Sequence, residues 1–534
     1  MILQSPNTAW RISRELGQSP RPPSPFSCPL LPSLLPSTAR TARTSPVTPR
    51  RRLPAGDAPI WWRSSSGFAA ACGILGTSRR RNAQAAAPAT ARRPRRRRMK
   101  HTHVNETDRA TRRQQVVNTD ETFVIVGGGL AGAKAAETLR AEGFGGRVIV
   151  IGDEGERPYE RPPLSKQFLA GKADRDSVFV HEPDWYEQAD VELRLGQPVV
   201  HLDRAAKTVR LDDGTSVRYD RLLLATGAEP RRLDVPGADL AGIHHLRDLA
   251  HAEQLREVLT EVGRDQGRLV IAGAGWIGLE VAAAARAYGA EVTIVQPSPT
   301  PLHRVLGPEL GAVFRDLHAE HGVRFHFGAR LTEIVGQDGT VVSVRTDDGA
   351  EHPAHALLVA VGAAPRMALA EAAGLAVVDR ADGGGIAVDA ALRTSDPFIH
   401  AAGDVAAADH PLLDTRLRVE HWANALNGGP AAARAMLGQD ISYDRVPYFF
   451  SDQYDLGMEY SGYAPPGSYD QVVCRGDVGK REFIAFWLRE GRVLAGMNVN
   501  VWDVTEQIQQ LIRSGTPLGP EKLADSQVPL ESLA

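Results

Sequence analysis

The chain has 534 residues, which is too long for a single hydrophobic core and indicates two or three domains. Apolar residues make up 43% and charged residues 24%, and no run of eighteen apolar residues occurs, so we expect a soluble protein without a membrane-spanning segment. The formal net charge of −2 is unevenly divided, because residues 1–98 hold eighteen arginines, no lysine and only two acids, about +16 against about −18 for the rest.

Cysteine is rare in this chain. Only Cys28, Cys72 and Cys474 occur, far apart in the sequence. This spacing excludes a disulfide framework and a cysteine-rich metal site, so no metal is expected. A reducing, cytoplasmic setting agrees best with it.

Residues 1–118 are rich in Pro, Ser, Ala and Arg and lack apolar periodicity, which predicts a disordered extension. Three interpretations stay open: an arginine-rich transit peptide, a basic arm for nucleic acid, or translated upstream sequence with Met99 as the start. We favour the last, because the folding signals begin only at Thr122. Nothing beside the segment resembles a nucleic-acid-binding fold, so nucleic acid is not expected as a partner. A membrane is not expected either, because no long apolar run occurs.

A strand, a glycine-rich turn and a helix are expected in order from residue 122. The strand covers 122–126, the turn reads Gly127-x-Gly129-x-x-Gly132, the helix covers 133–142, and a second strand follows at 148–151. In such a turn the first glycine permits the tight bend, the second lets the backbone approach a pyrophosphate, and the third lets the helix pack on the strand. Asp153 and Glu154 stand where a ribose contact is expected, so this unit is predicted to bind a dinucleotide.

The same arrangement returns about 145 residues later. A strand at 269–272 leads into Gly273-x-Gly275-x-x-Gly278, a helix through 287 and a strand at 291–295. Two intact units predict two dinucleotide ligands. Gln296 ends the second unit, where an acid would bond the ribose 2′-hydroxyl and repel a 2′-phosphate. The choice between NADH and NADPH stays open, because Gln neither repels that phosphate nor supplies an Arg to attract it.

Further short strands are expected along the rest of the chain. They precede Ala225-Thr226-Gly227, Val361-Gly362 and Gly403-Asp404. At the last of these, a carboxylate could bond a ribityl hydroxyl while a following helix N-terminus faces a flavin, although a Gly-Asp turn alone is usually a plain helix cap. After about residue 440 the sequence changes to short aromatic strands and a helix near 504–514, which indicates a third, α+β domain.

Five further segments stand in a fixed order: Glu160-Arg161-Pro162-Pro163-Leu164-Ser165-Lys166, Ala225-Thr226-Gly227, Gly278-Leu279-Glu280, Gly403-Asp404 and Arg418-Val419-Glu420-His421-Trp422. With the two glycine motifs, they make residues 122–510 resemble the FAD-dependent ferredoxin and rubredoxin reductases. That family includes the mitochondrial apoptosis-inducing flavoprotein and the reductase components of bacterial aromatic-ring dioxygenases. The resemblance implies a glutathione-reductase-like α/β fold with two Rossmann-type dinucleotide-binding domains and a C-terminal α+β domain.

The implied division of the chain has five parts. They are the extension at 1–118, the FAD domain in two pieces at 119–240 and 363–440, the NAD(P)H domain at 241–362, and the C-terminal domain at 441–534. A monomer or a homodimer is expected.

The resemblance also implies roles for single residues. Arg161 would contact the FAD phosphates, Lys166 would lie near the flavin N5, and Asp404 would hold the ribityl chain. Glu280 would orient the nicotinamide and pair with Lys166, while Trp422 would flank the isoalloxazine. A cation near N5 stabilises negative charge that develops on a reduced flavin, and a carboxylate partner fixes its position. Taken singly, each residue would instead be a surface charge or an ordinary core residue.

No cysteine lies between Cys72 and Cys474, so no thiol can take electrons from the flavin and disulfide-reductase chemistry is excluded. The family implies instead that NAD(P)H passes hydride to FAD, and that single electrons go on to a ferredoxin or rubredoxin for a monooxygenase or dioxygenase. Two alternatives stay open: an NADH:quinone or NADH:oxygen diaphorase, and a redox-sensing flavoprotein of the apoptosis-inducing type. For Trp276, inside the second glycine motif, only a packing role is expected.

Overall fold

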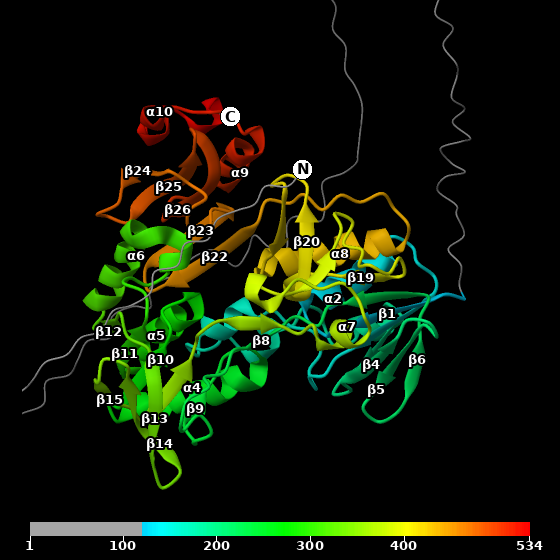
Figure 1. The fold of residues 1–534 in the computed structure, drawn as a ribbon, viewed down its shortest axis with the longest axis horizontal. Helices are drawn as coiled ribbons and strands as arrows, with labels where there is room; N and C mark the ends of the chain where they lie inside the picture. Colours follow the sequence, from blue (N-terminus) through cyan, green and yellow to red (C-terminus); the bar gives the residue numbers. More distant parts are fainter. Residues whose placement is uncertain (1–119, 534) are drawn as a thin grey trace, which may run out of the picture. The chain divides into compact units, whose positions relative to one another are not determined.

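A computed structural model describes residues 120–533 of the chain (Figure 1). The predictions made for residues 1–118, including a start at Met99, lie outside the described residues. Within 120–533, none of the helices combines the length and the apolar character that crossing a bilayer requires.

The first sheet contains five parallel strands in the order β19-β7-β1-β2-β3. These strands are β1 (Thr122–Val126), β2 (Arg147–Ile151), β3 (Val191–Arg194), β7 (Arg221–Leu224) and β19 (Ile399–Ala401). β1, β2 and β7 are nearly continuous runs of buried apolar residues, as expected of a parallel sheet that is covered on both faces. Because β19 pairs with β7 from far along the chain, this sheet is assembled from two pieces of the sequence.

Two helices pack closely beside the first sheet. α2 (Leu130–Ala141) connects β1 with β2 and packs against α8 (Trp422–Met436), which follows β19 and a small sheet (Figure 1). A Cβ atom placed on Gly429 of α8 would lie 2.2 Å from the carbonyl oxygen of Ala131, so the absence of a side chain lets the two backbones approach. The helix predicted at 133–142 begins three residues earlier, at Leu130, directly after Gly129.

The second sheet is also parallel, with the order β12-β11-β10-β16-β9. Its elements are β9 (Ile243–His244), α4 (Leu249–Arg264), β10 (Arg268–Ala272), α5 (Trp276–Tyr288), β11 (Glu291–Gln296), α6 (His303–Glu320), β12 (Arg324–Phe327) and β16 (Ala356–Val359). The chain enters and leaves this sheet through β8 (Ala228–Pro230) and β17 (Ala363–Pro365), which pair with each other antiparallel.

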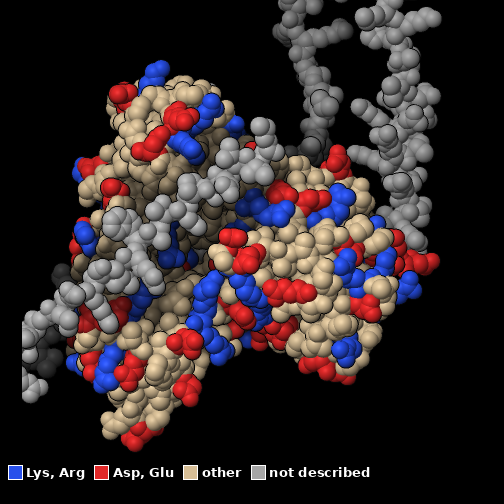
Figure 2. Space-filling model, viewed as in Figure 1, with Lys and Arg blue, Asp and Glu red and all other residues tan. Residues whose placement is uncertain are grey.

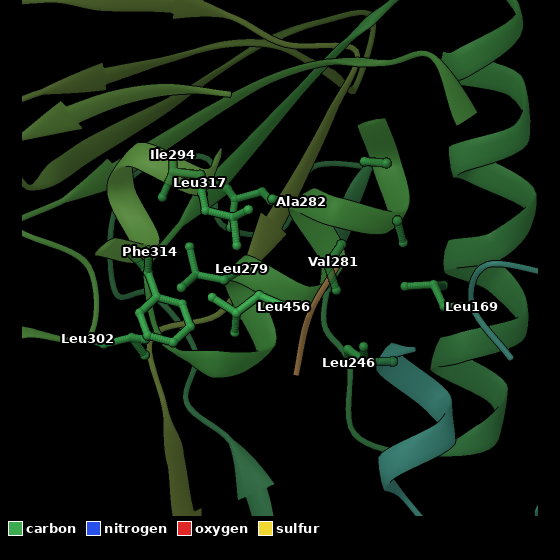
Figure 3. Packing of buried hydrophobic residues seen from close by; sticks show 14 of the residues in the cluster. Leu169, Leu246, Leu279, Val281, Ala282, Ile294, Leu302, Phe314, Leu317 and Leu456 are labelled. Carbon is green, nitrogen blue, oxygen red and sulfur yellow. The ribbon is translucent and has the colours of Figure 1, made fainter. Parts of the chain in front are cut away.

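One apolar cluster joins the second sheet to the rest of the described chain (Figure 3). Leu279 of α5 lies beside Phe314 and Leu302, while Val281 of the same helix faces Leu246 (Figure 3). The same cluster includes residues of the C-terminal sheet, among them Leu456. α5 is therefore held from several sides, which fixes the position of the residues near its N-terminus.

The third large sheet is antiparallel, with the order β22-β23-β26-β25-β24. Its strands are β22 (Tyr448–Gln453), β23 (Leu456–Gly462), β24 (Gln471–Asp477), β25 (Glu482–Arg489) and β26 (Arg492–Val499). α9 (Thr505–Ser514), which matches the helix expected near 504–514, packs on β23 and β26, and α10 (Pro520–Ala524) packs on β24.

Three small antiparallel or mixed sheets and several short helices complete the described chain. The sheets are β4 (Val199–Asp203) with β5 (Thr208–Leu211) and β6 (Ser216–Arg218), β13 (Leu331–Gln337) with β14 (Thr340–Thr346) and β15 (Glu351–Pro353), and β18 (Ile386–Val388) with β20 (Ala406–His410) and β21 (Thr415–Arg418). The short helices are η2 (Pro162–Ser165), η3 (Arg175–Val178), α3 (Trp185–Gln188), α7 (Ala368–Ala372), η4 (Arg380–Asp382), η5 (Gly403–Val405) and η6 (Leu530–Ser532).

Candidate functional site

A cavity of about 1080 Å³ lies where the carboxyl end of the first sheet meets the N-terminus of α5 and the N-terminus of α8. It is at the upper end of the size range of ligand pockets, which suits a dinucleotide. The predicted site residues that line it are Gly127, Gly129, Asp153, Glu154, Arg161, Lys166, Ala225, Thr226, Gly227, Glu280, Gly403, Asp404 and Trp422. The remaining ones, which do not line it, are Gly132, Gly273, Gly275, Gly278 and Gln296.

The three glycines of the first turn have different surroundings. A Cβ atom on Gly127 would lie 2.0 Å from the carbonyl oxygen of Ala225, and Gly127 also has a φ of +127°. A Cβ atom on Gly132 would lie 2.2 Å from the carbonyl oxygen of Gly127, whereas one on Gly129 would meet no atom within 4 Å. Gly127 and Gly132 are thus required by close packing, and Gly129 faces the open space of the cavity.

The second glycine turn repeats this pattern. A Cβ atom on Gly273 would lie 2.4 Å from the carbonyl oxygen of Ala360, one on Gly278 would lie 2.2 Å from that of Gly273, and one on Gly275 would meet no atom within 4 Å. The Gln296 side-chain oxygen accepts a hydrogen bond of 3.0 Å from the Ala274 backbone N–H. The side-chain oxygen of Gln296 therefore stabilises the glycine turn.

Lys166 and Glu280 lie together at the centre of the site. Lys166 Nζ is 2.9 Å from Glu280 Oε1, and the two side chains are only 12% and 4% exposed. The Ser165 hydroxyl donates to Glu280 Oε2, and the Ser451 hydroxyl donates to Oε1 over 2.6 Å. A buried ion pair is stable only when such additional hydrogen bonds offset the loss of hydration.

The two serines were not among the residues predicted from the sequence. Ser165 belongs to one of the matching segments, so that segment could have drawn attention to it. Ser451 lies in β22, in a run of aromatic residues without any motif, so nothing in the sequence singled it out.

The two acids after β2 are held by arginines. Asp153 pairs with Arg366 at 2.5 Å, and Glu154 pairs with Arg161 at 2.8 Å while accepting a hydrogen bond from the Tyr159 hydroxyl. These contacts fix both carboxylates at the rim of the cavity.

Asp404 pairs with an arginine that the sequence did not reveal. Arg247 Nη2 is 2.6 Å from Asp404 Oδ2, and the side chains are 19% and 13% exposed. Arg247 lies between β9 and α4, outside every motif. Asp404 lies in η5, a helix of only three residues, and the following helix whose N-terminus reaches the cavity is α8, which begins at Trp422.

Aromatic rings form one wall of the cavity. The Trp422 ring lies edge-on to Phe450 at 6.1 Å, and the His421 ring lies 4.6 Å from Phe449. The Trp276 ring lies 5.2 Å from that of Phe449, so Trp276 packs on the C-terminal sheet. Burial lowers the pKa of His421 to about 4, so this histidine is neutral at pH 7.

Several buried polar atoms that line the cavity could bind a ligand. His245 Nε2, Arg247 Nε and His421 Nδ1 are buried, line the cavity and have no hydrogen-bond partner among the described residues. Buried polar atoms are seldom left unpaired. In the middle of the face shown in Figure 2, Lys and Arg side chains lie among Asp and Glu side chains. The basic residues that line the cavity include Arg231, Arg232, Arg247, Arg366 and Arg380. These residues fit an anionic dinucleotide cofactor.

Two known protein families match this chain. The family described as pyridine nucleotide-disulphide oxidoreductase matches residues 121–429, and the family described as reductase C-terminal matches residues 448–534. The chain belongs to the pyridine nucleotide-disulphide oxidoreductase family. Cys474 is free, lies on β24 and does not line the cavity. Among the described residues, therefore, no thiol lies beside the site.

Named relatives agree with this family. Rhodocoxin reductase of Rhodococcus erythropolis is 37% identical over 409 residues, which cover 77% of this chain and 93% of the relative. The ferredoxin–NAD(+) reductase component of the anthranilate 1,2-dioxygenase system of Burkholderia cepacia is 39% identical over 411 residues, covering 77% and 98%. The ferredoxin reductase for the CYP199A2 system from Rhodopseudomonas palustris superposes with a TM-score of 0.73 at 36% identity, covering 78% of this chain and 100% of that one. The predicted fold class and family resemblance are confirmed.

Proposed function

We propose that this chain is an FAD-dependent NAD(P)H oxidoreductase that delivers electrons to a ferredoxin or rubredoxin of an oxygenase system. The observation that carries the proposal is the buried Lys166–Glu280 ion pair inside a dinucleotide-sized cavity. The relatives named as ferredoxin or rhodocoxin reductases support the choice of acceptor. The domain limits expected from the sequence, at 119–240, 241–362, 363–440 and 441–534, are part of this proposal.

The cavity residues would divide the cofactor between them. Gly129 leaves open space for the pyrophosphate, with the N-terminus of α2 supplying N–H groups. Arg161 would contact the phosphates, and Asp404, whose carboxylate pairs with Arg247, would hold the ribityl chain. When bound, FAD would supply the conversion between two-electron and one-electron chemistry.

Lys166 would provide fixed positive charge at the reacting end of the cofactor. Its ammonium group is nearly buried and is held by Glu280, so little reorganisation is needed when negative charge develops nearby. Such preorganised charge is most effective where water is excluded.

The second glycine turn would receive the nicotinamide nucleotide. Ile277 and Val361 line the cavity beside this turn and are 41% and 39% exposed, which leaves an apolar surface for a ring. Gln296 is uncharged, so we expect NADH to serve as reductant and NADPH not to be repelled by this position.

The proposal is tested by identifying the cofactor and its reductant. The purified protein is denatured by heat, and the released flavin is separated by chromatography against FAD and FMN standards. The holoprotein is then titrated with NADH and with NADPH without oxygen, and the visible flavin absorbance is followed. We expect one FAD per chain and bleaching by at least one of the nucleotides. A colourless protein, or a flavin that neither nucleotide reduces, would contradict the proposal.

A further inference from the structure

A row of buried polar side chains leads away from Glu280 into the C-terminal sheet. Ser451 and Gln453 on β22 are 0% and 1% exposed, and His318 on α6 is 0% exposed. Alternate residues of a strand point to the same face, so Ser451 and Gln453 project together. The row therefore links α5, β22 and α6, which come from separate parts of the chain.

Each neighbour in the row is within hydrogen-bonding distance of the next. Ser451 Oγ is 2.6 Å from Glu280 Oε1, and Gln453 Nε2 is 3.0 Å from Ser451 Oγ. His318 Nε2 is 2.8 Å from Gln453 Oε1, and the Tyr454 hydroxyl lies 3.5 Å from His318 Nδ1. The row is continuous from the ion pair to α6.

All hydrogen bonds of the row have the same direction. The single hydroxyl proton of Ser451 goes to the Glu280 carboxylate, which only accepts, so Ser451 must accept from the Gln453 amide. The Gln453 oxygen in turn accepts from His318. Burial lowers the pKa of His318 to about 4, so its ring is neutral at pH 7, and the contact with Gln453 assigns its proton to Nε2. Hydrogen bonds aligned in one direction polarise each other, here toward the negative charge of Glu280.

We propose that Ser451 and Gln453 are positioning residues, which hold Glu280 and through it Lys166 in the geometry required for hydride transfer. This inference rests on the proposed function of the site. It gives the C-terminal sheet a part in the reduction of the cofactor, because the hydroxyl that completes the Glu280 hydrogen bonds comes from β22.

The surroundings of Glu280 explain why one hydroxyl matters. Oε1 receives Lys166 and Ser451, while Oε2 receives Ser165. The carboxylate is almost inaccessible to solvent, so no bulk water readily replaces a donor that is lost. A hydrogen bond to a charged group is worth more than one between neutral groups, so its removal loosens the carboxylate that positions the ammonium group.

The test measures flavin reduction by NADH in the full-length holoprotein by anaerobic stopped flow. The variants are Ser451→Ala, Ser451→Cys and Gln453→Met. Cysteine keeps nearly the volume of serine but is a weak donor, and methionine keeps the length of glutamine without its amide. We expect the limiting reduction rate to fall about tenfold in each variant, while the apparent Kd for NADH changes less than about threefold. The double variant Ser451→Ala with Gln453→Met should reduce its flavin little more slowly than either single variant, because one substitution already interrupts the row of hydrogen bonds.

Ser461→Ala is the matched control. Ser461 lies on the adjacent strand β23, is 2% exposed and accepts one hydrogen bond of 3.2 Å from Gln509 Nε2, without contacting Glu280. We expect this variant to reduce its flavin at the wild-type rate.

The possible outcomes separate the explanations. A wild-type limiting rate in Ser451→Cys and Gln453→Met would overturn the inference, because packing alone would then suffice. An equal loss in Ser461→Ala would overturn it as well, since any buried serine of the sheet would have the same effect. If the wild-type protein itself holds no flavin that NAD(P)H reduces, the proposed function fails instead. If Ser451→Ala does not fold, the cysteine and Gln453 variants still decide.

Discussion

Glu280 is the residue on which the separate parts of the site converge. Its carboxylate binds Lys166 and Ser165 from the segment around η2 and Ser451 from β22. Because the group is buried and charged, every donor it receives contributes to keeping the ion pair in one geometry.

Replacing Lys166 with Met should slow flavin reduction strongly. The substitution removes the positive charge but keeps most of the side-chain length, so the cofactor should still bind. We expect the limiting rate with NADH to fall about a hundredfold, in the range found when one preorganised electrostatic group is removed. Stopped-flow absorbance measures the rate, and Lys172→Met, at an exposed position six residues along, is the control. An unchanged rate would remove the proposed role of Lys166.

Replacing Gln296 with Glu should disfavour NADPH. The introduced carboxylate could still accept the Ala274 N–H that Gln296 accepts, while its negative charge would repel a 2′-phosphate. We expect the ratio of kcat/KM for NADH to that for NADPH to rise about tenfold, equivalent to ~1.4 kcal/mol. The control is Gln337→Glu, at an exposed position at the end of β13. Unchanged selectivity would mean that position 296 does not read the 2′ group.

Some of these site residues could be predicted from the sequence, and others could not, because only some of them stand in local motifs. Lys166 and Glu280 stand in ordered motifs, where residue type and spacing are tied to local structure. Arg247 reaches Asp404 across 157 positions, and Ser451 reaches Glu280 across 171. Contacts of that separation depend on how sheets are placed in space, and neither residue belongs to a periodic pattern or a turn.

At the scale of elements, the glycine turns connect sequence and site most directly. The first and third glycines of each turn are required by carbonyl oxygens about 2 Å from where a Cβ atom would stand. The middle glycine of each turn faces open space. The motifs predicted where both turns lie, but the helix after the first turn begins at Leu130 and not at residue 133 as predicted.

Replacing Gly132 with Ala should therefore weaken cofactor retention. The new methyl group would stand 2.2 Å from the carbonyl oxygen of Gly127, so α2 or the turn must move. We expect the affinity for FAD to fall at least about tenfold, as overpacking commonly costs about 1–3 kcal/mol. Flavin fluorescence during dialysis measures the loss. Gly155→Ala is the control, since a Cβ atom there would meet nothing within 4 Å. Full retention in Gly132→Ala would contradict this view of the turn.

At the scale of the molecule, the sequence predicted the two parallel sheets well and the C-terminal sheet only in outline. The parallel sheets follow from a repeated strand, turn and helix pattern with apolar runs. The C-terminal part was expected only as short aromatic strands and a helix. Its contribution to the site could not be foreseen, because Phe449 and Ser451 act through contacts with α5 and α8 and not through local pattern.

Buried histidines should make the stability of the whole protein fall at acid pH. Burial lowers the pKa of His400 to about 4, and neither ring nitrogen has a hydrogen-bond partner among residues 120–533. The unfolded chain, with a histidine pKa near 6.5, binds a proton that the folded state excludes between about pH 6.5 and 4. The contribution of His400 to stability is therefore complete above about pH 6.5 and is lost as the pH falls toward 4.

His400→Leu should reduce this dependence. Urea unfolding at pH 7 and pH 5 should show a loss of free energy of unfolding about 2 kcal/mol smaller in the variant than in the wild-type protein. His201→Leu, at an exposed position on β4, should lose as much free energy of unfolding between pH 7 and pH 5 as the wild-type protein. An equal loss in His400→Leu and the wild type would show that His400 takes up its proton in the folded state.

The proposed function requires that electrons leave this protein for a small iron–sulfur protein. The most direct measurement is NADH- and NADPH-driven reduction of cytochrome c, with and without an added [2Fe–2S] ferredoxin, and with rubredoxin as a second acceptor. We expect saturable stimulation by one of these proteins and its loss in Lys166→Met. If NAD(P)H reduces the flavin while both proteins leave the rate unchanged, and quinone or oxygen accepts the electrons instead, the proposed function is wrong.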